Sequence, residues 1–215
     1  MKVKVAIVGT GELALHISHY LNLSDKYRVV GYIDDFVSKG ILVNSLPVIC
    51  SSEEAFYFYN SENVFDEIVV AIGYSRMNYR AKVFNNFFGK IKLTTFIHNS
   101  CVVDETVELG EGVIVFPGCV IDRNVSIKNN VFLHVGCIIS HDSTICDNSY
   151  LSPNTTTAGF VEIGEGCNIG ISTTISNHAK IHKGVRTGAG TVVVRDIIEP
   201  GTYVGVPARK IKNTI

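Results

Sequence analysis

Residues 133–157 read LHVGCIISHDSTICDNSYLSPNTTT, and the spacing of the aliphatic residues in this stretch decides the fold. A large aliphatic residue recurs at every sixth position, and the same register continues far beyond the stretch, broken only by two threonines. The column comprises Ile97, Val103, Leu109, Val115, Ile121, Ile127, Leu133, Ile139, Ile145, Leu151, Thr157, Ile163, Ile169, Ile175, Ile181, Thr187 and Val193. A helix repeats every 3.6 residues and a simple strand every 2, so neither accounts for this pattern. A step of six predicts a repeat architecture.

A second column of small residues lies four positions after the first. It comprises Cys101, Val107, Val113, Cys119, Val125, Val131, Cys137, Ser143, Ser149, Thr155, Val161, Cys167, Thr173, Ala179, Val185 and Thr191. One large and one small residue per hexad suit a narrow three-sided prism. Each short strand points a large side chain inward, and the next corner has room only for a small one. Stacked coils of this kind bury a continuous core.

Four of the six cysteines, Cys101, Cys119, Cys137 and Cys167, lie in the column of small residues. Three hexads make one coil, so Cys101, Cys119 and Cys137 are predicted to stack in one column. The sequence contains no CxxC pair, which argues against a zinc site. We therefore interpret these cysteines as small core residues with free thiols, rather than as disulfides or metal ligands.

The first half of the chain has a different periodicity. Residues 3–9, 28–33 and 66–73 are predicted as buried strands, and residues 12–23 and 79–88 as helices. Strands that alternate with helices across short turns indicate a small domain with a parallel sheet.

Several candidate binding residues follow the strands of this predicted sheet. Gly9 and Gly11 form a Gly-x-Gly turn after the first strand, Asp34 and Asp35 end the second, and Gly73 ends a later one. The third glycine of a dinucleotide fingerprint is missing. Ligands of open parallel sheets bind at the carboxyl ends of the strands, so these residues are predicted to bind a ligand together. A helix cap or turn is the structural alternative for the two aspartates.

Composition excludes some classes of function. The 215 residues are 46% hydrophobic, and 19 Lys and Arg against 20 Asp and Glu give a net charge of −1. Without a basic excess, nucleic acid is not an expected partner. No apolar stretch is long enough for a membrane span. The first residues lack the features of a signal peptide. We therefore expect a cytoplasmic protein.

Further motifs carry a family resemblance. Residues 163–167 (IGEGC), 187–193 (TGAGTVV) and 204–211 (VGVPARKI) are typical of hexapeptide-repeat acyltransferases with a left-handed β-helix. Joined to the first half, the chain resembles the sugar O/N-acetyltransferases of the sialic-acid and bacillosamine type. The resemblance implies a Rossmann-like α/β domain over residues 1–95, followed by an all-β left-handed parallel β-helix over residues 96–215.

The resemblance also implies roles for the N-terminal candidates. The small domain of this family holds a nucleotide sugar, and the matching positions are Gly9, Gly11, Asp34, Asp35 and Gly73. Many members carry Gly-Gly-His after the first turn, where this chain has Glu12 and Leu13 after Gly11. That histidine is thought to touch the sugar, so the sugar, its amine position and the nucleotide base stay unspecified.

His141 is the strongest catalytic candidate. Acyl transfer to an amine requires removal of a proton, which suits an imidazole. His141 lies two positions beyond the inward-facing Ile139, where we expect it to be reachable. In the resembling family, a histidine followed by an acid is the proposed general base and its helper, which implies His141 and Asp142. A surface histidine without a role is the alternative. His134, close in sequence, is a candidate for substrate contact.

Gly159 lies one coil after His141. Its backbone N–H is predicted to hold the oxyanion that develops on a thioester, a role that the resemblance also implies; a plain corner glycine is the alternative. Family members bind coenzyme A in a groove between neighbouring β-helices of a trimer. This implies acetyl-CoA as co-substrate, contacts from Gly159, Ile171 and Ala189, and an obligate homotrimer. Candidates for its 3′-phosphate are Arg186, Arg195, Arg209 and Lys210.

The resulting hypothesis is an acetyl-CoA-dependent N-acetyltransferase. It would acylate the amine of a nucleotide-linked amino-deoxy sugar, of the 4-amino-4,6-dideoxy kind, for a surface polysaccharide or glycan, by direct attack and without a metal. One alternative is O-acetylation of a sugar hydroxyl. Another is a non-catalytic β-helix binding protein, or a zinc-dependent hydratase in which His134, His141 and a third histidine converge.

Overall fold

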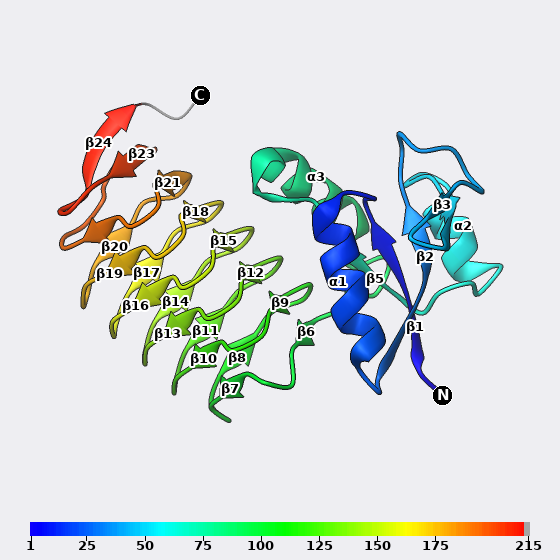
Figure 1. Ribbon diagram of the computed structural model, residues 1–215, viewed down its shortest axis with the longest axis horizontal. Coiled ribbons are helices and arrows are strands. Elements are labelled where there is room, and N and C mark those ends of the chain that lie inside the picture. The colour runs from blue at the N-terminus through cyan, green and yellow to red at the C-terminus, as the bar shows by residue number, and fades with distance from the viewer. Residues whose placement is uncertain (213–215) are drawn as a thin grey trace. The chain divides into compact units, whose positions relative to one another are not determined.

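The computed structural model describes residues 1–212, with the side chains described up to Ile211. The chain divides into two compact units, Met1–Thr95 and Phe96–Ile215 (Figure 1). Residues 213–215, which the predicted second domain includes, lie outside the described residues. The two units are described separately.

The N-terminal unit is built on a five-stranded sheet, here called sheet I, with the order β3-β4-β2-β1-β5. Four strands are parallel, and β3 pairs with β4 in the antiparallel sense. The strands are β1 (Val3–Val8), β2 (Tyr27–Ile33), β3 (Leu42–Val43), β4 (Leu46–Cys50) and β5 (Glu67–Val70). The helices are α1 (Glu12–Leu23), α2 (Ala55–Asn60), η1 (Tyr74–Arg76) and α3 (Met77–Phe87).

The interior strand β1 of sheet I is buried, because parallel strands with helical crossovers are covered on their faces. Val5, Ala6 and Ile7 of β1 are fully buried, and Phe87 of α3 packs into the same core cluster as Ala6. This buried sheet carries the loops that follow β1, β2 and β5 at one edge.

The predicted α/β architecture of this unit is confirmed, with differences at the boundaries. Helix α1 has the predicted bounds, whereas α3 begins two residues earlier than predicted. Strand β5 ends at Val70 instead of residue 73, because the chain leaves the sheet there and residues 71–73 form a loop. The hairpin β3–β4 and the short helix α2 were not predicted. Both are short and follow no clear hydrophobic period.

The second unit is a left-handed parallel β-helix, as predicted. Most of its strands are two residues long and stack in three parallel sheets (Figure 1). Sheet II contains β7 (Val102–Val103), β10 (Val120–Ile121), β13 (Ile138–Ile139), β16 (Thr156–Thr157), β19 (Thr174–Ile175) and β22 (Val192–Val193). Sheet III contains β8 (Glu108–Leu109), β11 (Ser126–Ile127), β14 (Thr144–Ile145), β17 (Glu162–Ile163) and β20 (Lys180–Ile181).

Sheet IV completes the prism. It contains β6 (Phe96–Ile97), β9 (Ile114–Val115), β12 (Phe132–Leu133), β15 (Tyr150–Leu151), β18 (Asn168–Ile169), β21 (Val185–Thr187), β23 (Gly201–Val204) and β24 (Arg209–Lys212). All its pairings are parallel except that of β23 with β24. Each coil turns a corner from sheet IV to sheet II, the IV/II corner, and then from sheet II to sheet III, the II/III corner.

The column of large residues at every sixth position forms the interior of the prism. Ile121, Ile139 and Thr157 lie side by side in adjacent coils of sheet II, and all three side chains are buried. Cys119 and Cys137 are also buried, and every cysteine is free. Cys119 and Cys137 are therefore small core residues, as predicted, and the half-buried Cys101 packs against the same core. Burial of one large aliphatic side chain is worth about 1.5–3 kcal/mol, so the repeated column dominates the stability of this unit.

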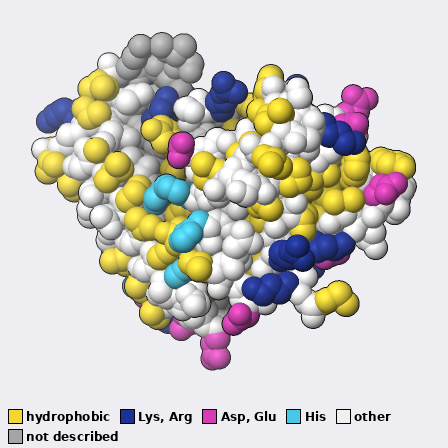
Figure 2. All heavy atoms as spheres, turned by 45° about the vertical axis from the view of Figure 1, so that its right-hand side comes forward, with side chains coloured by type: hydrophobic (Ala, Val, Ile, Leu, Met, Phe, Trp, Pro, Cys, Tyr) yellow, Lys and Arg dark blue, Asp and Glu magenta, His cyan; other side chains and the backbone are white. Residues whose placement is uncertain are grey.

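The surface is mixed in character. Figure 2 shows, on the face in view, Lys and Arg side chains in small groups separated by hydrophobic and acidic ones. This distribution agrees with the near-zero net charge. Among residues 1–212, no helix has the length and apolar character needed to cross a bilayer.

Candidate active site

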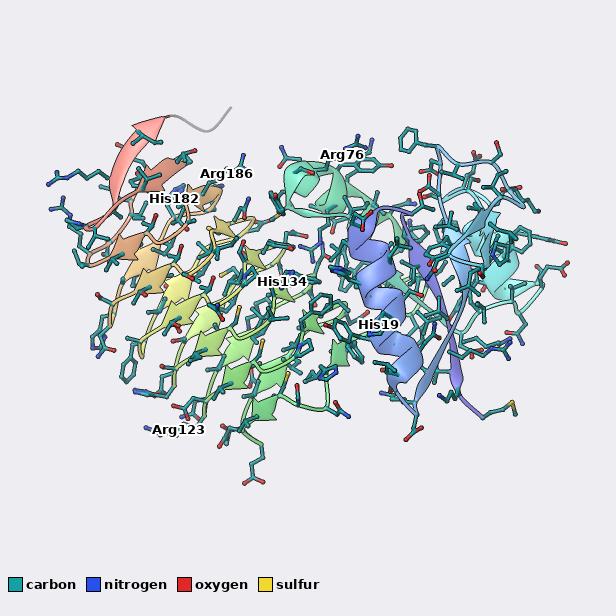
Figure 3. The ribbon with its side chains drawn as sticks, in the orientation of Figure 1. His19, Arg76, Arg123, His134, His182 and Arg186 are labelled. Atoms are coloured by element: carbon teal, nitrogen blue, oxygen red, sulfur yellow. The ribbon has the colours of Figure 1, made fainter. Side chains whose placement is uncertain are left out.

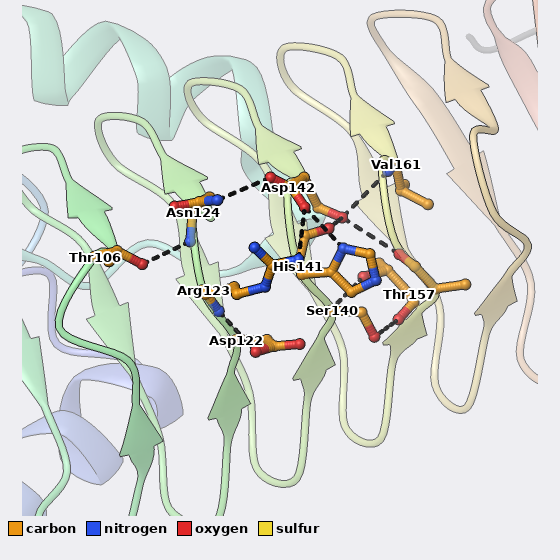
Figure 4. Close-up of polar contacts among 11 residues, drawn as sticks. Thr106, Asp122, Arg123, Asn124, Ser140, His141, Asp142, Thr157 and Val161 are labelled. Atoms are coloured by element: carbon orange, nitrogen blue, oxygen red, sulfur yellow. Dashed lines mark hydrogen bonds and ion pairs between the residues drawn. The ribbon is translucent and has the colours of Figure 1, made fainter.

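His141 lies directly after β13, at the II/III corner, and its side chain is 35% exposed. Its Nδ1 lies 2.8 Å from Oδ2 of Asp142 (Figure 4). Adjacent side chains on an extended strand diverge, but Asp142 has a φ of 56°. This left-handed backbone turns the carboxylate back toward the preceding ring. The contact between two sequence neighbours thus depends on the corner conformation.

Asp142 is held on its other side as well. Its Oδ1 accepts a hydrogen bond of 3.0 Å from Asn124 Nδ2, one coil earlier, and Arg123 Nη2 lies 3.9 Å from its Oδ2. The hydrogen bonds from Asn124 and His141, with the nearby Arg123 guanidinium, hold the pKa of this carboxyl below its usual range. An ionised Asp142 only accepts, so His141 donates from Nδ1. The lone pair of Nε2 is then available as a proton acceptor.

Gly159 lies against the imidazole from the next coil. A Cβ atom at this position would lie 2.5 Å from Cε1 and 2.7 Å from Nε2 of His141. A glycine is therefore required for the ring to occupy its place. The carbonyl of Gly159 accepts a hydrogen bond from His178 N at 3.1 Å, whereas no residue in the described part of the chain accepts one from its N–H. The sequence predicted the proximity of this glycine to His141 but not the steric requirement.

Thr157, which interrupts the aliphatic column, supports the segment before His141. Its Oγ1 accepts a hydrogen bond from Ser140 N at 3.2 Å, and its carbonyl oxygen accepts one from Ser140 Oγ at 2.7 Å (Figure 4). An aliphatic residue at position 157 would leave the backbone N–H of Ser140 without this acceptor. The sequence identified the break in the column without indicating this reason.

The cysteines of the coils around His141 are poor nucleophiles. Cys137 is fully buried and therefore out of reach of a substrate. Burial raises the pKa of the half-buried Cys146 thiol, and raises that of Cys167 to about 12. The thiols of Cys146 and Cys167 therefore stay protonated at neutral pH and carry no nucleophilic thiolate.

His134 occupies a different corner. It follows β12, at the IV/II corner, whereas His141 lies at the II/III corner. Arg123 also lies at the II/III corner, and Figure 3 shows His134 and Arg123 at different edges of the β-helix. Its Nδ1 accepts a hydrogen bond from Val135 N at 2.8 Å, and its ring lies near Phe116 and Phe132. The structure therefore does not bring the two histidines together. Among residues 1–212 no group of three or more His, Cys, Asp or Glu residues is arranged to hold a metal ion.

The predicted cofactor contacts fall into separate places. Ile171 and Ala189 are both exposed at the IV/II corner in adjacent coils, where Gly190 N donates to the carbonyl of Ile171 at 2.8 Å. Gly159 lies at the II/III corner. Within one chain, these contacts thus lie along two different edges of the prism.

Arg209 and Lys210 lie on β24 and line a groove of about 500 Å³ that also includes Arg195. Lys210 Nζ lies 2.9 Å from Glu199 Oε2, and this pairing raises the pKa of the ammonium group. Arg209 and Arg195 are the positive groups of this groove that the described ion pairs do not involve.

The five predicted ligand-binding residues of the N-terminal unit come together. Gly9, Gly11, Asp34, Asp35 and Gly73 all line one pocket of about 420 Å³ at the carboxyl edge of sheet I. Gly9 has a φ of 107°, which favours glycine, and its N–H donates to the carbonyl of Ile33 at 2.8 Å. The turn after β1 is thereby fixed to the end of β2.

The two aspartates of this pocket have different surroundings. Asp34 accepts hydrogen bonds from Thr10 Oγ1 and from the backbone N–H groups of Phe36 and Val37, at 2.8, 2.8 and 3.1 Å. Asp35 accepts one from Ser52 N at 2.7 Å. Asp34 therefore organises the loop, and Asp35 keeps more of its acceptor capacity for a ligand.

Sequence reasoning missed other residues of the pocket. Thr10, Phe36, Arg76 and Tyr79 also line it. Burial, together with the neighbouring Asp35, raises the pKa of the Tyr79 hydroxyl, which therefore stays a hydrogen-bond donor at neutral pH. Arg76, in η1, supplies a positive charge (Figure 3). Arg76 and Tyr79 follow Gly73 closely, and this position after a strand end was the available signal.

Comparisons with known proteins agree with both halves of the chain. The model of the PglD N-terminal domain matches residues 4–87. PerB from Caulobacter crescentus, solved in complex with CoA and GDP-perosamine, is 28% identical, with a TM-score of 0.85 and 97% of each chain covered. The acetyltransferase domain of PglB from Neisseria gonorrhoeae is 25% identical, with a TM-score of 0.87, over 98% of this chain and 100% of that one.

These comparisons decide the type of protein. Residues 4–87 resemble the PglD N-terminal domain. The whole chain is an N-acetyltransferase of the hexapeptide-repeat type, as the sequence predicted. WeeI from Acinetobacter baumannii, at 22% identity, a TM-score of 0.84 and 96% and 99% coverage, shares the fold of this acetyltransferase. No match was found among curated protein sequences.

Proposed function

We propose that this acetyltransferase transfers an acetyl group from acetyl-CoA to the amine of a nucleotide-linked amino-deoxy sugar. The observation that carries the proposal is the His141–Asp142 pair at 2.8 Å beside Gly159, in a chain that also contains a pocket for a nucleotide. PerB, similar along its whole length, was solved with CoA and GDP-perosamine, and the PglB domain was solved with acetyl coenzyme A.

In the proposed reaction, the sugar amine attacks the thioester carbonyl carbon. The nitrogen loses a proton to Nε2 of His141, whose imidazolium is stabilised by Asp142. The carbon–sulfur bond then breaks, and the same proton passes to the leaving sulfur, so that CoA departs as the thiol. The N–H of Gly159, which has no acceptor in the described part of the chain, is assigned to the oxyanion.

The pocket of the N-terminal unit is assigned to the nucleotide. Asp35 and the Tyr79 hydroxyl offer an acceptor and a donor to polar edges of a base or ribose. Arg76, together with the backbone N–H groups of Thr10 and Gly11, suits the diphosphate. His134, at the IV/II corner, is still assigned to substrate contact, and the substrate atom that it would contact is not specified.

A homotrimer belongs to the same proposal. Val102, Val120 and Ile138 form an apolar outward column on sheet II, with exposed fractions of 65%, 38% and 42%. This column lies between the II/III corner, with Gly159, and the IV/II corner, with Ile171 and Ala189. Packing of sheet II against other copies covers the column, and brings the II/III corner of one copy to the IV/II corner of its neighbour. One CoA then contacts all three residues, with Arg209 and Lys210 as candidates for its phosphates.

The proposal places the enzyme in the cytoplasm, on a route to a surface polysaccharide or glycan. The six free cysteines suit a reducing compartment.

The test is an assay of CoA thiol release from acetyl-CoA with a panel of 4-amino-4,6-dideoxy and 3-amino sugar nucleotides bearing GDP, UDP or dTDP. The product is identified by mass spectrometry. Formation of an N-acetyl product with one member supports the proposal. Acetylation confined to hydroxyl groups of free sugars would replace it with O-transfer. Equilibrium sedimentation of the same sample tests the trimer, and a monomer would contradict the shared CoA groove.

A further inference from the structure

The II/III corner contains one residue, Phe160, that does not fit the rule for its backbone. In this corner Asn124, Asp142, Phe160 and His178 follow one another at intervals of one coil, with φ values of 56°, 56°, 58° and 62°. Apart from Phe160 and His178, the non-glycine residues with positive φ in the described part of the chain are Asn, Asp or Ser. Asparagine, aspartate and histidine tolerate this conformation, whereas a bulky side chain such as that of phenylalanine is disfavoured in it. Such outliers concentrate at functional sites.

Burial of the Phe160 ring does not offset the cost of its left-handed backbone. Its side chain is 46% exposed and lies outside the core cluster of the prism. An asparagine or glycine would adopt the same backbone at lower cost and lose little buried apolar surface. Core packing therefore does not account for phenylalanine at this position.

Phe160 contacts the catalytic ring on one side and a second histidine on the other. The Phe160 and His141 rings are perpendicular, with centroids 5.2 Å apart. The Phe160 and His178 rings are stacked, with centroids 4.9 Å apart and an interplanar angle of 7°. The backbones of these residues are also hydrogen-bonded, since Phe160 N donates to the carbonyl of His141 at 3.0 Å. Three aromatic rings thus form a continuous column along the corner.

This column completes the surroundings of the His141 imidazole. Asp142 fixes Nδ1, and Gly159 leaves room for Cε1 and Nε2. Neither contact prevents the exposed ring from rotating away into solvent. The perpendicular ring of Phe160 blocks part of that movement, and the stacked His178 restricts the ring of Phe160 in turn.

We propose that Phe160, supported by His178, is a positioning residue that holds His141 in the orientation where Nδ1 faces Asp142 and Nε2 faces the substrate amine. The inference rests on the proposed function, since it takes His141 as the general base. It assigns to the exposed aromatic stack a role in the rate of the chemical step, and none in binding either substrate.

The test compares variants that remove the ring with one that keeps it. Phe160→Asn and Phe160→Gly suit the left-handed backbone but lack the ring, whereas Phe160→Tyr retains it. His178→Asn removes only the stacking partner. Ser45→Asn is the matched control, because Ser45 has a φ of 66° in the exposed turn between β3 and β4 of the N-terminal unit, outside its pocket.

We expect Phe160→Asn and Phe160→Gly to lower kcat about 10- to 100-fold, the range that follows from misplacing a catalytic group by about 1 Å. KM for both substrates and Tm should stay near the wild-type values. Phe160→Tyr should restore most of the rate, His178→Asn should give a smaller loss, and Ser45→Asn none. Wild-type kcat in both ring-less variants, or an equal loss in Ser45→Asn, would overturn the inference.

A measurement without substrate separates this inference from the proposed function. The ¹⁵N chemical shifts of the His141 ring, assigned by their loss in His141→Ala, report how its proton is shared between the two nitrogens. In Phe160→Gly these shifts should move toward those of a solvent-exposed histidine. Unchanged shifts would contradict the positioning role even in an active enzyme. Full activity of His141→Ala would instead refute the general base, whatever the shifts show.

Discussion

The pocket of the N-terminal unit and the His141 corner are built in opposite ways. The pocket is a concave site at the edge of sheet I, lined by residues of several loops and helices of one unit. The His141 corner is convex, and its geometry depends on short contacts between neighbouring coils. All residues that line the pocket come from one unit, whereas the corner presents an imidazole that is 35% exposed. A change at the corner should therefore affect catalysis more than binding, and a change in the pocket the reverse.

The largest effect is expected from His141→Ala. Loss of a general base lowers kcat by about 10²- to 10⁴-fold. The KM for the nucleotide sugar should change little, because the residue is assigned only to the chemical step. Steady-state kinetics with both substrates would measure this. His16→Ala, at an exposed position on α1, is the control. Equal losses in both variants would show that the loss is not specific to the His141 corner.

The next largest effect is expected from Gly159→Ala, with a loss of about 10²-fold in kcat. The added Cβ would lie 2.5 Å from Cε1 of His141, so it displaces the imidazole. Gly166→Asn provides the comparison. Gly166 has a φ of 65° and open space around its Cβ position, and an asparagine suits that backbone. The prediction is contradicted if Gly159→Ala works at the wild-type rate, since the ring would then have another place to lie.

Asp142→Asn should cause a smaller loss, about tenfold in kcat, since a hydrogen bond to a charged group is worth about 1.5–3 kcal/mol and part of it is retained by the amide. The pH dependence has a definite sign. The pKa of Asp142 is lowered on folding, so its contribution to stability is present above the unfolded pKa of about 3.9 and is lost as the pH falls through the folded pKa.

Thermal melting from pH 7 to pH 3 measures this second effect. The difference in Tm between the wild-type protein and Asp142→Asn should shrink toward the acidic end. A difference that stays constant as the pH falls would show that the carboxylate charge is not its source.

The smallest rate effects are expected in the pocket. Asp35→Ala should raise the KM for the nucleotide sugar by about tenfold, as expected for the loss of one hydrogen bond of about 1.4 kcal/mol, with kcat and Tm nearly unchanged. Asp34→Ala should also lower the stability, by about 1–3 kcal/mol, because three donors lose their acceptor. Kinetics and chemical unfolding of the two variants test the difference. Equal unfolding midpoints would contradict the structural role of Asp34.

The sequence predicted the β-helix more completely than the site. The step of six from Ile97 to Val193 is a property of every coil, so a single sequence contains it many times. The position of His141 relative to the core followed from the same register. The contact between His141 and Asp142 did not, because it depends on a φ of 56° that the residue type permits but does not require.

Other features depend on contacts between distant segments. The function of Thr157 as an acceptor for Ser140, and the steric need for Gly159, appear only when adjacent coils are stacked. In the N-terminal unit the five glycine and aspartate positions followed from the rule for parallel sheets. Arg76 and Tyr79 join them because η1 and α3 follow β5 directly.

The hydrogen bonds that connect equivalent corners span 18 residues, as between Asn130 and Asn148. An insertion or deletion of one whole coil therefore keeps every inward column aligned, whereas a change of six residues would carry the catalytic edge around to a neighbouring side of the prism. The length of such a β-helix can therefore change only by whole coils of 18 residues. The separation between the catalytic edge and the end of the β-helix can be altered in steps of one strand spacing, about 4.8 Å, without redesigning the interior.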